Sequence, residues 1–198
     1  SLKALIQSGH KVSCVVTQPD RKKGRGLSVS WTSIKDTANA LRIKSFQPEN
    51  VNDGDCEKFL KELKADLFVV IAYGQILAQE VLCIPKLMAI NVHASLLPHY
   101  RGAAPIQWAI INGDTLSGVS VIKLTRKMDA GPILLSKPIT IEQNETVDAL
   151  EVRLSLLGAQ SQWRPGGGWP DGEFEWQAIP GRRRGASRVR GHTPGRPG

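Results

Sequence analysis

The chain of 198 residues has little cysteine, few aromatic residues and no long apolar segment. Its three cysteines, Cys14, Cys56 and Cys83, lie far apart and form no C-x-x-C pair, which argues against a metal site or a disulfide framework. We expect them to be buried thiols. No apolar run approaches the roughly 18 residues that a membrane-spanning helix requires, so we expect no association with a membrane.

Acidic residues are also scarce relative to basic ones, and the formal net charge is +8. The composition changes sharply near the end, because residues 159–198 hold seven arginines, nine of the 19 glycines and no lysine. No helical or alternating apolar pattern continues there, so we expect an irregular tail with little packed structure. Two explanations stay open. One is an arm that binds nucleic acid through Arg182–Arg184; the other, which we favour, is translation out of frame.

Residues 1–158 alternate between segments that predict helices and segments that predict strands. Helices are predicted where apolar residues recur at helical spacing, and strands where β-branched and apolar residues form short runs. The predicted helices are 1–9, 31–43, 55–65, 78–85, 104–114 and 146–158, and the predicted strands are 11–18, 43–48, 66–74, 87–93, 118–124 and 132–139. This order predicts an α/β fold with a doubly wound, mostly parallel sheet.

Two further expectations follow from this order of elements. The strand at 66–74 is the most apolar and shows no alternation, so we expect it to be central in the sheet. The chain opens on a helix, and a helix at that place in a doubly wound fold needs a preceding strand. We therefore expect that the first strand of the sheet is missing.

Polar side chains follow the predicted strands at the edge where ligands of such sheets bind. Asn91 and His93 are two residues apart in one strand, so both side chains point to the same face. An amide N–H and a protonated imidazole can together stabilise a developing oxyanion. Asp129, from another loop, can hold the charge of the imidazole or relay a proton. On their own, these residues favour the structural alternative, a histidine satisfied in a loop and an asparagine that caps a turn, because short motifs often match by chance.

A longer motif favours the catalytic interpretation. The segment NVHASLLPHYRG matches N-x-H-x-S-L-L-P-x-x-R-G at residues 91–102, and MDAGPIL follows at residues 128–134. Together they resemble the signature of the folate-dependent formyltransferases, which move a formyl group from 10-formyltetrahydrofolate to an amine. The resemblance covers residues 1 to about 158. It implies a Rossmann-like formyltransferase fold with Asn91, His93 and Asp129 as catalytic residues, and a chain truncated at both ends, without the family's first strand and C-terminal barrel.

The resemblance also implies a binding site for the reduced folate. In that family the pterin ring lies in an apolar pocket between loops and is held largely by backbone groups, and no metal is implied. The residues that match the folate site are Ile71, Tyr73, Gly74, Gln75, Ile76, Leu77, Ser95, Leu96, Leu97, Pro98, Lys127 and Met128.

A basic segment, TQPDRKKGRGLSVS, follows the first predicted strand and resembles the loop with which methionyl-tRNA formyltransferases reach the acceptor end of initiator tRNA. Arg21, Lys22, Lys23 and Arg25 place four cations in five residues, and the intervening glycine lets the backbone approach phosphate closely. An ordinary solvated turn is the alternative. We predict that these four residues bind tRNA.

The predicted activity is formyl transfer from 10-formyltetrahydrofolate to the α-amino group of methionyl-tRNA, by oxyanion stabilisation and acid–base assistance. Two alternatives stay open: a non-catalytic RNA-binding fragment, and a formyltransferase or hydrolase of the same family with another substrate. The resemblance implies a monomer in the bacterial cytoplasm or in the matrix or stroma of an organelle. The catalytic domain is expected at residues 1–158, followed by the low-complexity tail at 159–198.

Overall fold

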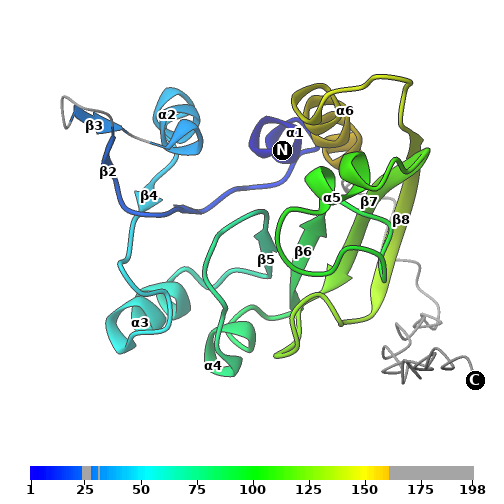
Figure 1. Cartoon of the computed structure of the whole chain (residues 1–198). Coiled ribbons are helices and arrows are strands. Elements are labelled where there is room, and N and C mark those ends of the chain that lie inside the picture. The colour runs from blue at the N-terminus through cyan, green and yellow to red at the C-terminus, as the bar shows by residue number, and fades with distance from the viewer. Residues whose placement is uncertain (24–27, 31, 161–198) are drawn as a thin grey trace, which may run out of the picture.

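Helices and strands alternate along the computed structural model, which describes residues 1–23, 28–30 and 32–160 (Figure 1). Each segment predicted as a helix or strand forms that element within a few residues. The helices are α1 (Leu2–Gln7), α2 (Ser33–Ala40), α3 (Gly54–Glu62), α4 (Gln79–Leu82), α5 (Pro105–Ile111) and α6 (Val147–Gln160). The strands are β1 (Val15–Val16), β2 (Arg21–Lys23), β3 (Ser28–Ser30), β4 (Ser45–Phe46), β5 (Leu67–Val70), β6 (Met88–His93), β7 (Leu116–Lys123) and β8 (Ile133–Thr140). The α/β fold class is confirmed.

Local sequence signals explain where several helices begin and end. Asp53 caps α3, since its carboxylate accepts a hydrogen bond from the backbone N–H of Cys56 at 2.7 Å. Pro105 stands at the first position of α5, where its missing N–H costs nothing. Gly9 follows α1 with a φ of 83°, a conformation that glycine adopts without strain.

The described strands form three hydrogen-bonded sheets. β1 pairs with β4 in parallel, and β2 pairs with β3 as an antiparallel hairpin. The largest sheet has the order β5-β6-β7-β8, in which β5 and β6 are parallel while β7 and β8 run antiparallel to their neighbours. The loop at residues 124–132 joins β7 directly to β8, so the two antiparallel strands form a hairpin.

The expected central place of β5 is wrong within the described residues. β5 stands at one end of the four-stranded order, and all four of its residues are half-buried. Of its four residues, Phe68 packs against the cluster that contains Cys56 and Leu60 of α3 and Val81 of α4. Apolar runs report burial of side chains on both faces of a strand and carry no information about which strands flank it.

Three apolar clusters hold the elements together. Cys56 and Leu60 of α3 lie in one cluster with residues from β1, β4 and β5. A second joins α1, β1 and α2 around the fully buried Ala38. In the third, Leu150 and Leu154 of α6 pack against β7 and α5, which lie beside α6 in Figure 1.

The cysteines only partly follow the expectation of buried thiols. Cys56 is buried, Cys14 is half-buried and Cys83 is exposed. None of the helices in the described ranges combines the length and the apolar character needed to cross a membrane.

Candidate functional site

Asn91 and His93 lie on β6, inside the four-stranded sheet. Asn91 stands opposite Ile122 of β7, and His93 stands opposite Ser120. Because side chains alternate along a strand, both project from the same face. His93 is 7% exposed, and Asn91 is half-buried. The amide of Asn91 and the imidazole of His93 therefore lie on one face of β6, in a region with little access to solvent.

Asp129 joins this pair from the loop between β7 and β8. Its Oδ1 accepts a hydrogen bond from Asn91 Nδ2 at 3.4 Å, and its Oδ2 lies 3.7 Å from His93 Nδ1. The backbone N–H of Gly102 donates to Oδ2 at 2.8 Å. Asp129 is 8% exposed and adopts a φ of 45°. The structure therefore brings the three side chains singled out in the sequence into one buried group; their catalytic roles stay predictions.

The second ring nitrogen of His93 is occupied by the protein itself. His93 Nε2 lies 2.8 Å from the backbone carbonyl oxygen of Tyr100. A carbonyl oxygen only accepts hydrogen bonds, so Nε2 carries the hydrogen and Nδ1 is the nitrogen that faces Asp129. The sequence did not indicate which ring nitrogen would face the reacting atoms. Toward the carboxylate, His93 offers Nδ1 alone, as a base when neutral and as a donor when protonated.

The loop after β5 holds half of the residues predicted to bind folate, and it divides into exposed and packed positions. Ile71 and Ile76 are exposed, at 39% and 68%. Tyr73 and Leu77 pack against the cluster around α3, where burial, followed by the effect of Cys56, raises the pKa of Tyr73 to about 12. Gln75 spans to the segment before α3, accepting from the N–H of Val51 and donating to the carbonyl of Glu49. Gly74 adopts a φ of 85°.

The loop after β6 holds four more of the predicted folate residues. Ser95 Oγ donates to the carbonyl of His99 at 2.6 Å, and the N–H of Leu97 donates to Ser120 Oγ at 3.0 Å. Leu96 is half-buried, and Pro98, which follows a cis peptide bond, is exposed. These contacts shape the loop against β7.

The loop between β7 and β8 supplies the last two predicted folate residues. Lys127 and Met128 are both exposed, directly before Asp129. They directly precede the buried Asp129, and they line neither the cavity bounded by Ser95, Tyr100 and Ser117 nor the one bounded by Arg101 and Trp108.

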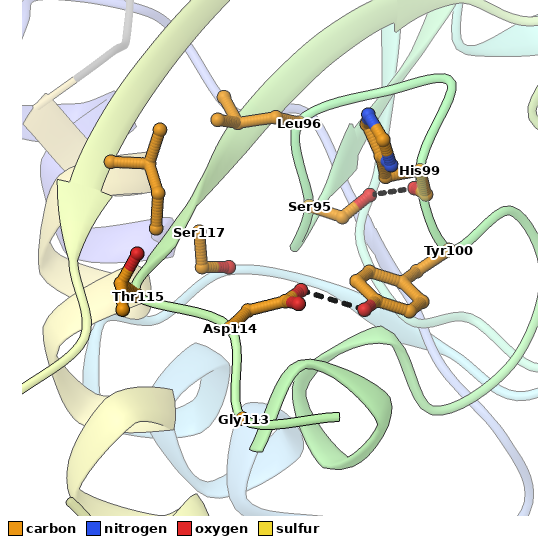
Figure 2. A pocket seen from close by; sticks show the side chains of 9 residues that line it. Ser95, Leu96, His99, Tyr100, Gly113, Asp114, Thr115 and Ser117 are labelled. Carbon is orange, nitrogen blue, oxygen red and sulfur yellow. Dashed lines mark hydrogen bonds between the residues drawn. The ribbon is translucent and has the colours of Figure 1, made fainter. Parts of the chain in front are cut away.

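A cavity of about 470 Å³ opens beside the loop after β6 (Figure 2). It is lined by Ser95, Leu96, His99, Tyr100 and residues 113–117. Of the predicted folate residues, Ser95 and Leu96 alone belong to its lining, and the group of Asn91, His93 and Asp129 does not. The cavity therefore does not mark the predicted folate site.

The basic segment forms the β2–β3 hairpin, in which Arg21 pairs with Ser30, Lys22 with Val29 and Lys23 with Ser28. Arg25 lies outside the described residues. Just before β2, Asp20 forms an ion pair with Lys35 of α2 and accepts from Gln47 Nε2 at 2.9 Å. The hydrogen bond from Lys35, followed by that from Gln47, lowers the pKa of Asp20. The base of the hairpin is thereby fixed to α2 and to Gln47, the residue after β4.

Sequence reasoning missed two residues of the site. The backbone carbonyl of Tyr100 contacts His93, and the backbone N–H of Gly102 donates to Asp129. Residue type gives little information about contacts made by backbone atoms. The available signal was that both belong to the matched 91–102 motif. Among the described residues, no group of three or more His, Cys, Asp or Glu side chains could hold a metal ion.

Comparison with known proteins places the chain among formyltransferases. A family model described as formyl transferase matches residues 1–162. The chain is 48% identical over 160 residues to a protein from Thermodesulfovibrio yellowstonii and 46% identical over 161 residues to one from Caldanaerobacter subterraneus, both named methionyl-tRNA formyltransferase. Each match covers 81% of this chain and 52% of the relative, so the chain spans about half the length of these relatives.

Solved structures show the same fold at lower identity. The phosphoribosylglycinamide formyltransferase of Bacillus halodurans superimposes with a TM-score of 0.68 at 21% identity, over 81% of this chain and 84% of that one. A formyltetrahydrofolate deformylase from Pseudomonas syringae gives 0.65 at 20% identity, over 80% and 53%. These similarities, at about 20% identity, show the fold alone. The family model matches residues 1–162, which is most of the chain, and the chain therefore belongs to the formyl transferase family.

Proposed function

We propose that the chain transfers a formyl group from 10-formyltetrahydrofolate to the α-amino group of methionyl-tRNA. The observation that carries this proposal is the buried group of Asn91, His93 and Asp129, formed by segments 38 residues apart. Family membership supports formyl transfer as the chemistry. The relatives named methionyl-tRNA formyltransferase, at 48% and 46% identity, support the choice of acceptor.

In the proposed reaction, the neutral amine attacks the formyl carbon and a tetrahedral intermediate forms. Asn91 Nδ2 carries two hydrogens and shares one with Asp129 across 3.4 Å, so an N–H is available to the developing oxyanion. His93 Nδ1, when protonated, supplies a second positive donor. The attacking nitrogen loses a proton to Asp129, directly or through water, and a proton returns to the folate nitrogen as its bond to carbon breaks.

The remaining residues bind the two substrates in this proposal. The loops at 71–77, 95–98 and 127–128 hold the reduced folate, and Arg21, Lys22, Lys23 and Arg25 contact the phosphates of the acceptor end. The antiparallel pairing of β2 with β3 and the ion pair of Asp20 with Lys35 support this second assignment, because they fix the backbone at the base of the basic segment. Contacts of cations with phosphate supply most of the affinity for nucleic acid. We place the protein as a monomer in the bacterial cytoplasm or in an organelle of bacterial origin.

The rival class is a fragment that binds RNA without catalysis. It requires the basic hairpin and gives the group of Asn91, His93 and Asp129 no catalytic role. Acting on another formyl acceptor is the second alternative. The solved structures named for other substrates are about 20% identical and support the shared fold.

The test measures formylation of methionyl-tRNA by the chain and by three variants. Asn91→Ala and His93→Ala should each lower kcat about 10²- to 10³-fold, by analogy with other oxyanion donors. Asp129→Asn should lower it about 10²- to 10⁴-fold, because its side chain no longer takes up a proton. Binding of tRNA should be nearly unchanged in all three, since the cations of the hairpin are intact.

The matched control is His99→Ala, which removes an exposed imidazole from the same loop and should transfer formyl groups like the parent. The enzyme proposal fails if the parent binds tRNA but no reduced folate, and His93→Ala is indistinguishable from it. Transfer to another amine in preference to methionyl-tRNA would retain the chemistry and overturn the acceptor.

A further inference from the structure

The segment that follows His93 is held in an unfavourable backbone conformation. Tyr100 and Ala104 adopt φ values of 54° and 59°, in the left-handed region that residues other than glycine rarely occupy. Gly102, between them, has a φ of 90°, and Asp129 across the site has 45°. Such conformations persist where surrounding contacts over-determine them, and they gather at functional sites.

The side chain of Tyr100 supplies those contacts. Its hydroxyl donates to Asp114 Oδ2 at 2.6 Å and accepts from Asn112 Nδ2 at 2.9 Å. Figure 2 shows the phenol pointing across the cavity toward the carboxylate. On the same loop, Ser95 Oγ closes onto the carbonyl of His99 at 2.6 Å.

The partners of the phenol belong to the hydrogen-bonded turn that ends α5. The N–H of Asp114 donates to the carbonyl of Ala109 at 3.0 Å. Asn112 caps the C-terminal end of α5, and its backbone N–H donates to the carbonyl of Trp108. Ala109 is 1% exposed. The phenol is therefore tied to a turn that is itself bonded to a buried part of the helix.

The backbone of Tyr100 in turn acts on the imidazole. Its carbonyl oxygen lies 2.8 Å from His93 Nε2, which fixes the hydrogen on that nitrogen and turns Nδ1 toward Asp129. If this carbonyl shifts, the hydrogen is no longer fixed on Nε2 and the ring is no longer held with Nδ1 toward Asp129.

We propose that Tyr100 is a positioning residue: its phenol, held by Asp114 and Asn112, keeps its strained backbone carbonyl on His93 and so selects the tautomer and orientation of the imidazole. The hydroxyl of the phenol is bonded to Asp114 and Asn112 rather than to Asn91, His93 or Asp129, and the inference rests on the proposed function for its catalytic consequence. The geometry of the ring is testable without any catalysis.

The first readout is the ring N–H of His93, observed by NMR in the full chain labelled with 15N-histidine and assigned by comparison with His93→Ala. In the parent the Nε2–H resonance should be protected from exchange with water. In Tyr100→Phe and in Asp114→Ala it should broaden or vanish, with a mixture of ring tautomers at neutral pH. Asp114→Asn keeps an oxygen acceptor for the phenol and should retain the resonance.

The second readout is kinetic. Tyr100→Phe and Asp114→Ala should each lower kcat about 10- to 100-fold, while KM for both substrates stays near that of the parent, because misplacement of a catalytic group acts on the chemical step. The double variant should be no slower than the slower single variant, since both remove one connection.

The control is Asp66→Ala, which removes a carboxylate from an exposed ion pair with Lys86 and should change neither readout. An unchanged Nε2–H resonance in folded Tyr100→Phe and Asp114→Ala overturns the inference, whatever the activity. Loss of the resonance in both, with retention in Asp114→Asn, supports it. If the parent transfers no formyl group while the resonance responds in this way, the proposed function fails and the positioning stands.

Discussion

Gly118 lies in the middle of β7, at the point where the loop after β6 packs onto the sheet. A Cβ at this position would overlap the carbonyl oxygen of Lys137 on β8 and stand 2.5 Å from Leu96 Cδ2. Real Cβ atoms do not make such contacts, so glycine is required for close approach. The absence of one methyl group thus allows Leu96, a predicted folate residue, to lie against the strand.

At the residue scale, we expect Gly118→Ala to destabilise the protein by about 1–3 kcal/mol, the range for overpacked sites. Alanine otherwise suits a strand interior better than glycine by about 0.5–1 kcal/mol, and the overlap with a backbone carbonyl outweighs that gain. Unfolding in urea gives the free energy of unfolding.

Gly54→Ala serves as the control for Gly118→Ala. Gly54 begins α3, and a Cβ added there would meet no atom within 4 Å, so the free energy of unfolding of this variant should equal or exceed that of the parent. Equal stability of the two alanine variants would contradict the steric explanation.

At the scale of single elements, Arg153 of α6 pairs with two carboxylates that precede the helix, closely with Glu145 and at 3.5 Å with Glu142. Arg153 Nη1 donates to both carboxylate oxygens of Glu145, at 2.8 and 2.7 Å, and the N–H of Glu142 donates to Glu145 Oε2 at 2.9 Å. The pair joins the turn before the helix to its second turn. It thereby sets the approach of Leu150 and Leu154 to the core.

This ion pair predicts a dependence of stability on pH. The hydrogen bond from Arg153, followed by that from the N–H of Glu142, lowers the pKa of Glu145. A lowered pKa in the folded state gives stability that is present above the unfolded value, about 4.3, and is lost as the pH falls through the folded value. Glu145→Gln should therefore be less stable than the parent at pH 7, and the difference should shrink below about pH 4.

Chemical unfolding at several pH values measures this difference in the free energy of unfolding. Glu151→Gln, an exposed position on the same helix, is the matched control and should follow the parent at each pH. A difference between Glu145→Gln and the parent that stays constant down to about pH 3 would show that the pair has no influence on the titration.

At the scale of the whole chain, side chains rather than backbone bonds join the two parallel strand pairs. β1 and β4 form their own sheet, apart from β5 and β6, within the described residues. Val16 of β1, Phe46 of β4 and Phe68 of β5 all pack around Cys56 and Leu60 of α3. The helix therefore connects the half that carries the basic hairpin to the half that carries the buried catalytic candidates.

We expect Leu60→Ala to lower the free energy of unfolding by about 2–5 kcal/mol, because the residue is 4% exposed and its loss leaves a cavity. Hydrogen exchange should quicken in both β1–β4 and β5, since both sheets depend on this cluster. Leu156→Ala, at a position 59% exposed, should change stability by no more than about 0.5 kcal/mol. Faster exchange confined to one sheet would contradict the connecting role of α3.

Local sequence was sufficient to predict the type and order of the elements other than the strands β2 and β3, which lie in the segment interpreted as a basic loop. Apolar periodicity, capping residues and glycines act within a few neighbours along the chain. Asp53 at the start of α3 and Pro105 at the start of α5 are examples. It also singled out Asn91, His93 and Asp129, since two residues of one strand share a face and the motif marks the third. Membership of the formyl transferase family is shown by the match of the family model to residues 1–162.

The place of β5 at the end of its sheet and the use of His93 Nε2 by the carbonyl of Tyr100 emerged only from the folded chain. The position of β5 depends on which strands lie beside it, and the apolar pattern within a strand is the same whether the strand is central or at an edge. The second depends on a backbone oxygen, which every residue has, and on the bond between Tyr100 and Asp114 that holds it. Local sequence does not predict contacts between distant segments or contacts made by backbone groups, because both depend on how the folded chain brings those segments together.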